Sequence, residues 1–138
     1  MNTYSRAMNF YSRRSEERLS TCHSDIQKVF REVLKIVDHS IIWGHRGKAD
    51  QDAAFASGAS EKKWPESKHN AEPSLAVDAR PYPYDKKDFE SMCLFAGVVL
   101  GVAKCLNVRI RWGGDWNKNY STRDEKFRDY WHFELIET

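Results

Sequence analysis

The sequence is poor in the features that mark secreted, membrane-spanning or nucleic-acid-binding chains. It has only 3 cysteines among 138 residues, at distant positions, so no disulfide framework is expected. Its longest uncharged run, residues 91–103, has 13 residues, fewer than the roughly 20 that a membrane-spanning helix needs. The formal net charge is only +2, without the basic excess of a nucleic-acid-binding protein. We therefore expect no membrane insertion and no nucleic-acid partner.

Residues that interrupt regular structure are also few. All 4 prolines lie between residues 65 and 83, which predicts one irregular region. Apolar residues make up 41% of the chain and aromatic residues 13%, enough for a hydrophobic core. We therefore expect a single domain over residues 1–138, with the polar residues 1–19 forming a loosely packed arm. The charged residues of that arm also exclude a secretory signal peptide.

Hydrophobic periodicity predicts an α+β fold. Apolar residues recur at helical spacing over residues 24–37 and 88–106, which predicts two main helices. Ser24 and Gln27 have the spacing of a capping box at the start of the first one. A short helix is predicted at residues 49–57, and short strands at residues 40–44, 75–79, 108–112 and 131–136. The pattern indicates a small, mainly antiparallel sheet with the two main helices packed on one face.

Two glycines lie inside the second main helix. Gly97 and Gly101 each destabilise a helix by about 1 kcal/mol relative to alanine. Close packing of the helix against the sheet would explain this cost. We therefore expect both glycines to face the sheet.

Alternation along two predicted strands brings polar side chains to one face. Asp78, in the strand at residues 75–79, points away from the apolar side chains, as do His132 and Glu134 in the last strand. His69 lies just before the first of these strands. One carboxylate and two imidazoles on the open face suit a zinc site with three protein ligands. The same residues also suit an ordinary polar rim, and their spacing does not decide between the two interpretations.

Several motifs make the sequence similar to a known family. The main ones are Ser67-Lys-His69, Ala76-Val-Asp78 and Asp129-Tyr-Trp-His132-Phe-Glu-Leu135. Their order resembles that of the VanX/VanY-type zinc peptidases, and most closely that of the phage endolysin branch, the L-alanyl-D-glutamate peptidases. The turn Gly44-His-Arg46, Gln51 and the segment Arg111–Trp116 add to the resemblance. It extends from about residue 19 to residue 137.

The resemblance implies a role for each matched residue. His69, Asp78 and His132 correspond to the ligands of one zinc ion per chain. Asp129 corresponds to the catalytic acid and base, and Arg46 to the arginine that stabilises the transition state. The residues expected to contact the substrate are Ser67, Gln51 and Trp116.

One loop departs from the family pattern. His69 and Asp78 are nine residues apart, two more than in the family motif. Ser74 stands where the motif has glycine, and Pro73 lies in the insert. The ending Ala76-Val-Asp78 is intact, so we expect a changed loop and unchanged ligands.

The resemblance also implies a fold and a function. The fold is of the VanY/hedgehog peptidase type, with the zinc site on the sheet face opposite the main helices. The function is that of a bacteriolytic phage endolysin that hydrolyses the L-Ala–D-Glu bond of peptidoglycan stem peptides. We expect a monomer without a separate wall-binding domain, made in the host cytoplasm and dependent on a holin to reach the wall. Two alternatives remain open: a D-Ala-D-Ala dipeptidase or carboxypeptidase of the same clan, and an inactive peptidoglycan-binding module.

Overall fold

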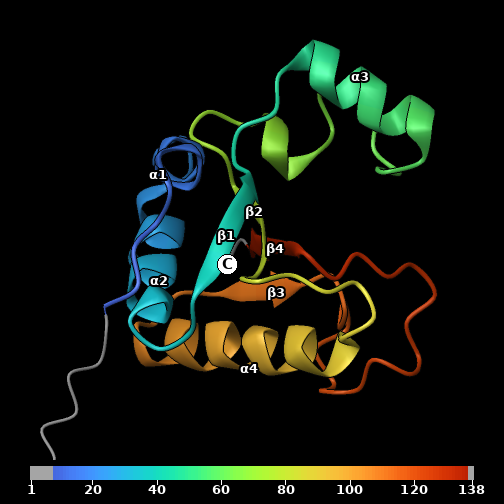
Figure 1. Cartoon of the computed structure of the whole chain (residues 1–138). Helices are drawn as coiled ribbons and strands as arrows, with labels where there is room; N and C mark the ends of the chain where they lie inside the picture. Colours follow the sequence, from blue (N-terminus) through green and yellow to red (C-terminus); the bar gives the residue numbers. More distant parts are fainter. Residues whose placement is uncertain (1–7, 137–138) are drawn as a thin grey trace, which may run out of the picture.

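The computed structural model describes residues 8–136, which form a four-stranded antiparallel sheet with helices around it (Figure 1). The helices are α1 (Arg13–Ser20), α2 (Ser24–Leu34), α3 (Lys48–Ser57), α4 (Phe89–Cys105) and the short 3-10 helix η1 (Lys68–Asn70). The strands are β1 (His39–Trp43), β2 (Ala76–Pro81), β3 (Ile110–Trp112) and β4 (His132–Leu135), in the spatial order β1-β2-β4-β3. The α+β fold predicted from the sequence is confirmed.

The core lies between the sheet and the two main helices. Phe133 of β4 makes edge-to-face contacts with Phe30 of α2 and Phe95 of α4, with ring centroids 5.5 and 5.9 Å apart. All three side chains are fully buried, and each stabilises the fold by about 1.5–3 kcal/mol. Because Phe133 follows His132 in the strand, His132 points to the opposite face. The packing of α2 and α4 thus leaves one face of the sheet free for polar side chains.

Helix α2 begins where the sequence predicts, but with a different cap. Its N-cap is His23, whose Nδ1 accepts a hydrogen bond from the backbone N–H of Asp25 at 3.0 Å. The predicted capping box of Ser24 and Gln27 is therefore wrong. Gln27 instead donates its side-chain N–H to the carbonyl oxygen of Cys22 at 2.9 Å. An imidazole here takes the role that serine usually plays.

Helix α4 matches its predicted range, but its two glycines lie on the unexpected side. Asp88 caps it by accepting the backbone N–H of Ser91 at 3.0 Å. Its buried residues are Met92, Phe95, Ala96, Val99 and Ala103. A Cβ atom at Gly97 or Gly101 would meet nothing within 4 Å, so the expectation that they face the sheet is wrong. The helical period turns both glycines away from the buried stripe.

The N-terminal segment is packed more firmly than the sequence predicts. Residues 1–7 lie outside the described part of the chain, but residues 13–20 form α1, capped by Ser12. Leu19 is fully buried in the core. Ser15 Oγ accepts the backbone N–H of Ile41 at 3.0 Å and so joins α1 to β1. For residues 8–19 the expected loose arm is therefore wrong, because one buried leucine and one buried hydroxyl anchor the helix.

Two absences expected from the sequence hold for the described residues. The 3 cysteines are free thiols, with Cys22 buried and Cys105 exposed. Within residues 8–136, no helix is long and apolar enough to pass through a lipid bilayer.

A histidine lies buried in the core, away from the polar face of the sheet. His39 packs against Tyr11, Phe30 and Phe95. Its Nδ1 lies 2.8 Å from the carbonyl oxygen of Val37, and its Nε2 lies 2.6 Å from the Tyr11 hydroxyl. Burial lowers the pKa of His39 to about 4, because the charged imidazolium loses its hydration.

This shift predicts a loss of stability in acid. The unfolded chain binds a proton at His39 near pH 6.5, whereas the folded chain does so only near pH 4. The free energy of unfolding is therefore highest above pH 6.5 and falls by about 2 kcal/mol between pH 7 and pH 5. Urea unfolding of the wild type and of His39→Leu, both with a chelator present, measures this contribution. The variant should lack that part of the decrease, and parallel pH profiles would contradict the assignment.

Candidate metal centre and its pocket

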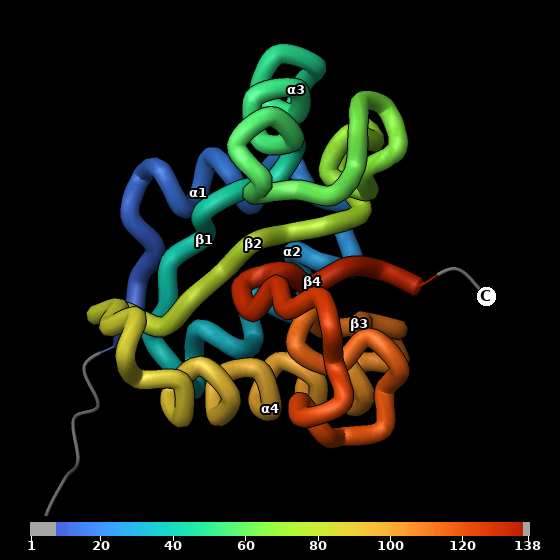
Figure 2. The backbone as a smooth tube through the Cα atoms, turned by 90° about the vertical axis from the view of Figure 1, so that its right-hand side faces the viewer, coloured from blue at the N-terminus to red at the C-terminus, as the bar shows by residue number. Residues whose placement is uncertain are grey.

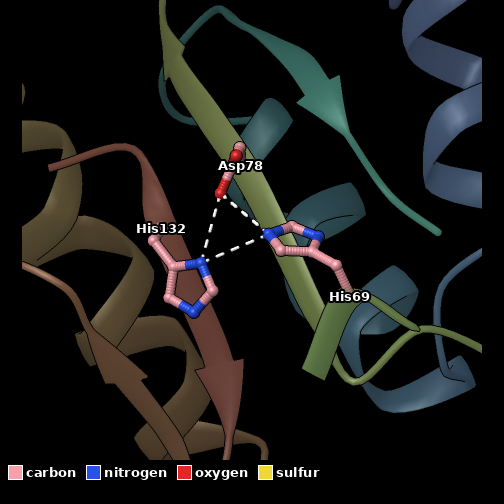
Figure 3. Close-up of side chains that lie close together, drawn as sticks. All are labelled: His69, Asp78 and His132. Atoms are coloured by element: carbon pink, nitrogen blue, oxygen red, sulfur yellow. Dashed lines mark hydrogen bonds and ion pairs between the residues drawn. The ribbon is translucent and has the colours of Figure 1, made fainter. Parts of the chain in front are cut away.

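Three side chains from separate elements converge on the polar face of the sheet (Figure 3). His69 comes from η1, Asp78 from β2 and His132 from the start of β4. Nε2 of His69 lies 3.1 Å from Oδ1 of Asp78 and 3.2 Å from Nδ1 of His132. The third side of the triangle, from Nδ1 of His132 to Oδ1 of Asp78, is 3.3 Å. Asp78 and His132 are direct partners in the β2–β4 register, which explains their closeness.

Local contacts hold His69 in place. Ser67 caps η1, because its Oγ accepts the backbone N–H of His69 at 3.2 Å. Nδ1 of His69 lies 2.8 Å from the carbonyl oxygen of Gly44. A Cβ atom at Gly44 would lie only 2.1 Å from the carbonyl oxygen of Arg18, so only glycine allows this approach. The turn after β1 thus brings a carbonyl acceptor to the back of the first histidine.

The loop that carries the two-residue insert ends at Ser74, which docks on the α1–α2 connection. The backbone N–H of Ser74 donates to Thr21 at 2.9 Å, and Ser74 accepts from the N–H of His23 at 2.8 Å. Ser74 is fully buried. The end of this loop therefore lies beside residues 21–23, and His69 still lies 3.1 Å from Asp78 despite the two additional residues.

The outer hydrogen bonds of both histidines determine which nitrogen faces the centre. Nδ1–H of His69 donates to the carbonyl of Gly44, so its Nε2 carries a lone pair. Nε2–H of His132 donates to Oε1 of Glu134 at 2.9 Å, so Nδ1 of the neutral ring carries a lone pair. When both histidines are neutral, two lone pairs and a carboxylate oxygen therefore face one another. Such a set suits a cation, and tetrahedral zinc, with bonds of about 2.0–2.1 Å, separates its ligand atoms by about 3.3 Å.

The charges of the site also favour a cation. Burial alone would lower the pKa of His132, but its contacts with Asp78 and Glu134 outweigh burial and raise that pKa to about 9. Burial likewise opposes ionisation of Asp78, yet the neighbouring His69 and His132 hold the pKa of its carboxyl far below the usual range. The metal-free site therefore takes up a proton where a metal ion would supply positive charge.

Asp129 lies at the edge of the centre. It begins the turn into β4, because its carbonyl accepts the backbone N–H of His132 at 3.1 Å. Its Oδ2 lies 3.9 Å from Nδ1 of His132, and a third of its side chain is exposed. Burial, and then the charge of Asp78, raise the pKa of Asp129. Gly113 makes this turn possible, since a Cβ atom there would lie 2.1 Å from the carbonyl oxygen of Asp129.

Arg46 lies on the other side of Asp78. Its Nη2 is 3.5 Å from Oδ2 of Asp78, and its guanidinium lies over the ring of Trp43, 4.9 Å from the centroid. The side chain is buried, and its Nε has no hydrogen-bond partner among the described residues. Asp78 and Trp43 thus hold the positive charge of Arg46 beside the metal centre.

Gln51 lies behind Arg46 and not against the pocket. Its side chain has 0% exposure. Oε1 accepts from Nη1 of Arg46 and from Nδ2 of Asn70, both at 3.2 Å. Nε2 donates to Oγ of Ser60 at 3.0 Å and to the carbonyl of Lys62 at 2.7 Å. The sequence predicts substrate contact for Gln51, but a side chain without exposed surface holds Arg46 and the 60–62 loop instead.

A pocket of about 420 Å³ opens beside the centre. Among the residues that line it are Arg46, Ser67, Lys68, His69, Asp78, Arg111, Trp116, Asp129, His132 and Glu134. Two of the expected substrate contacts, Ser67 and Trp116, are among them. The ring of Trp116 lies 5.6 Å from that of His132, and its Nε1–H donates to Phe127 at 2.7 Å. Figure 2 shows α3 and the loop after it at one end of the sheet and the β3–β4 segment at the other.

Sequence reasoning assigned no role to three charged residues of this pocket. Oε2 of Glu134 lies 2.8 Å from Nη2 of Arg111 and 3.3 Å from Nζ of Lys68. Alternation in β4 already put Glu134 on the same face as His132. Arg111 is its partner in the β3–β4 register, a pairing that sequence spacing does not reveal. Glu134 thus joins a candidate ligand to two cations.

Comparison with known proteins shows similarity over nearly the whole chain. Residues 8–136 match the family described as phage L-alanyl-D-glutamate peptidase. The chain is 33% identical over 135 residues to the L-alanyl-D-glutamate peptidase of Escherichia phage T5, covering 91% of this chain and 97% of the relative. The crystal structure of Serratia marcescens L-Ala D-Glu endopeptidase ChiX is similar, with a TM-score of 0.71 and 26% identity. That match covers 93% of this chain and 91% of ChiX.

Proposed function

Because the chain belongs to the phage L-alanyl-D-glutamate peptidase family, we propose that it is a zinc enzyme that cuts the L-Ala–D-Glu bond of peptidoglycan stem peptides. The chain is a peptidoglycan endopeptidase of the endolysin type. One observation supports its dependence on zinc: Nε2 of His69, Oδ1 of Asp78 and Nδ1 of His132 lie within 3.3 Å of one another. This donor set is that of a catalytic zinc site with three protein ligands.

His69, Asp78 and His132 hold the zinc ion, one per chain. Bound zinc supplies a Lewis acid that makes water more acidic and polarises a carbonyl group. Gly44 and Glu134 accept the outer N–H groups of the two histidines, which fixes the tautomer and the orientation in which each ring would bind the metal.

Asp129 moves the proton. Its partly exposed carboxylate lines the pocket with Oδ2 3.9 Å from His132. There it takes a proton from the attacking water and donates it to the leaving amide nitrogen of D-Glu. Gly113 permits the turn that carries this carboxylate.

Arg46 stabilises the negative charge that develops on the carbonyl oxygen during attack. Its guanidinium is held by Asp78, Trp43 and Gln51, so it needs little reorganisation. Gln51 is a positioning residue in this scheme, while Ser67 and Trp116 line the substrate pocket.

The proposed activity is bacteriolytic and antimicrobial. We place synthesis of the protein in the host cytoplasm, with a holin giving it access to the wall, on the strength of the family resemblance. The same resemblance supports action as a monomer on peptidoglycan stem peptides.

Digestion of purified peptidoglycan, followed by mass spectrometry, tests this function. The expected products are stem peptides with a free D-Glu amino group, lost when a chelator is present and restored by zinc. Release of terminal D-Ala alone would indicate a carboxypeptidase of the same clan. Zinc-loaded protein that binds the wall without cutting it would indicate an inactive binding module.

Glu134 offers a test of the zinc site that leaves every ligand in place. Replacing Glu134 with alanine removes the acceptor for Nε2–H of His132, and should weaken zinc binding about 10- to 100-fold. Competition with a chromophoric chelator measures this affinity. Glu17→Ala, on the exposed side of α1, serves as the control and should bind zinc like the wild type. Equal affinity of the two variants would exclude the proposed role of Glu134.

A further inference from the structure

We propose that Arg111 binds the free α-carboxylate of the D-Glu residue and makes the enzyme selective for it. The inference rests on the proposed cleavage of the L-Ala–D-Glu bond, and it names the group of the substrate that this site distinguishes. Around Glu134, in the wall of the pocket, two cations face a single carboxylate.

Two cations share one carboxylate beside the metal centre. Arg111 and Lys68 both approach Oε2 of Glu134, at 2.8 and 3.3 Å. Neither forms an ion pair with another carboxylate of the described residues. Oε1 of Glu134 is already taken by His132. Arg111 and Lys68 therefore carry one more positive charge than Glu134 balances.

Arg111 is the cation best prepared to bind an anion. Its guanidinium lies over the ring of Trp116, 5.4 Å from the centroid. Its one hydrogen bond within residues 8–136 joins Nη2 to Glu134, although a guanidinium has five N–H groups. Nε is buried without a partner, and a third of the side chain is exposed. Trp116 and Glu134 thus hold the plane of the guanidinium while most of its donors stay free.

Lys68 has a different role. Its Nζ also donates to the carbonyl oxygen of Leu135, so its ammonium is tied to the end of β4. By sharing the charge of Glu134, Lys68 leaves the positive charge of Arg111 available to a ligand. Arg46 is less available, because it is buried and faces Asp78.

The chemistry of the substrate matches this position. In a peptide cut between L-Ala and D-Glu, the α-carboxyl carbon is two bonds from the scissile nitrogen. It therefore lies near the residues that act on that nitrogen. Arg111 lines the same pocket as Asp129 and His132. A guanidinium recognises a carboxylate through paired N–H···O bonds, which a carboxamide cannot reproduce.

A matched pair of substrates tests the proposal. Both are N-acetylated L-Ala-D-Glu peptides extended through the γ-carboxyl, one with a free α-carboxylate and the other with an α-carboxamide. The zinc-loaded wild type should cleave the carboxylate peptide with about a 10- to 100-fold higher kcat/KM. Arg111→Gln should bring that ratio close to one, and Arg111→Lys should keep part of it. Arg109→Gln, an exposed neighbour outside this pocket, should keep the full ratio.

The ratio separates recognition from structural damage. Loss of Arg111 also disturbs Glu134 and His132, which would slow both substrates equally and leave the ratio unchanged. Zinc content and Tm of each variant establish that it folds and binds metal. A wild-type ratio near one, or a ratio that Arg111→Gln preserves, would overturn the subsite. Cleavage of neither peptide by the wild type would contradict the proposed function itself, and the subsite with it.

Discussion

Replacing Asp129 with asparagine should lower kcat for peptidoglycan cleavage by about 10²- to 10⁴-fold, the usual contribution of a general acid and base. Asparagine has nearly the same shape, but it neither accepts the proton of the attacking water nor delivers one to the leaving nitrogen. Asp129 is not among the three converging ligand atoms, so the variant should still bind one zinc ion per chain. Turnover and metal content of the same preparation are the two measurements.

Asp52→Asn provides the matched control for this experiment. Asp52 lies on the exposed side of α3, where it pairs with Lys48, and its replacement should leave kcat unchanged. If Asp129→Asn turned over like the wild type, the proton carrier would have to be another group of the pocket. If the variant lost zinc instead, Asp129 would act mainly by holding the metal centre.

Replacing His132 with alanine should remove zinc and activity together. His132 supplies one of three ligand atoms and is the partner of Asp78 in the sheet. Loss of a ligand weakens binding more than loss of an outer contact, so we expect zinc affinity to fall by more than about 100-fold. Activity should fall to background at zinc concentrations that saturate the wild type. Metal analysis after dialysis and the peptidoglycan assay measure the two losses.

A second histidine variant controls for the loss of an imidazole as such. His23 caps α2 and is not one of the three residues of the metal centre. The variant His23→Asn keeps a side chain that can accept the backbone N–H of Asp25. This variant should keep both zinc and activity. Wild-type zinc affinity in His132→Ala would show that the three converging residues are not the metal ligands. Together the Asp129 and His132 variants distinguish a group that moves a proton from a group that holds the metal.

The sequence alone predicted the elements whose energetics are local. Helix α4 follows from its apolar spacing, which lies within one stretch of chain. Alternation in β4 put His132 and Glu134 on one face, because successive side chains of a strand point to opposite sides. The motifs around Ser67, Asp78 and Asp129 indicated a peptidase of the phage endolysin type, and the family match confirms that indication.

The tertiary structure decided which groups meet across the fold. Gly44 reaches His69 only because α1 packs against the turn after β1. Gln51 is buried because the 60–62 loop folds over it, which changed its expected role from substrate contact to support of Arg46.

The cluster at the pocket wall has the same origin. The pairing of Arg111 with Glu134 depends on the β3–β4 register, and segments far apart in sequence set that register. Gly97 and Gly101 face outward for a similar reason, since the stripe buried against the sheet decides how α4 is turned. The spacing of residues within one helix or strand can be read directly from the sequence. Burial and strand register, in contrast, result from the packing of segments that are distant in the sequence. The elements and the residues of the candidate metal site were therefore readable from the sequence, and their partners became evident only in the fold.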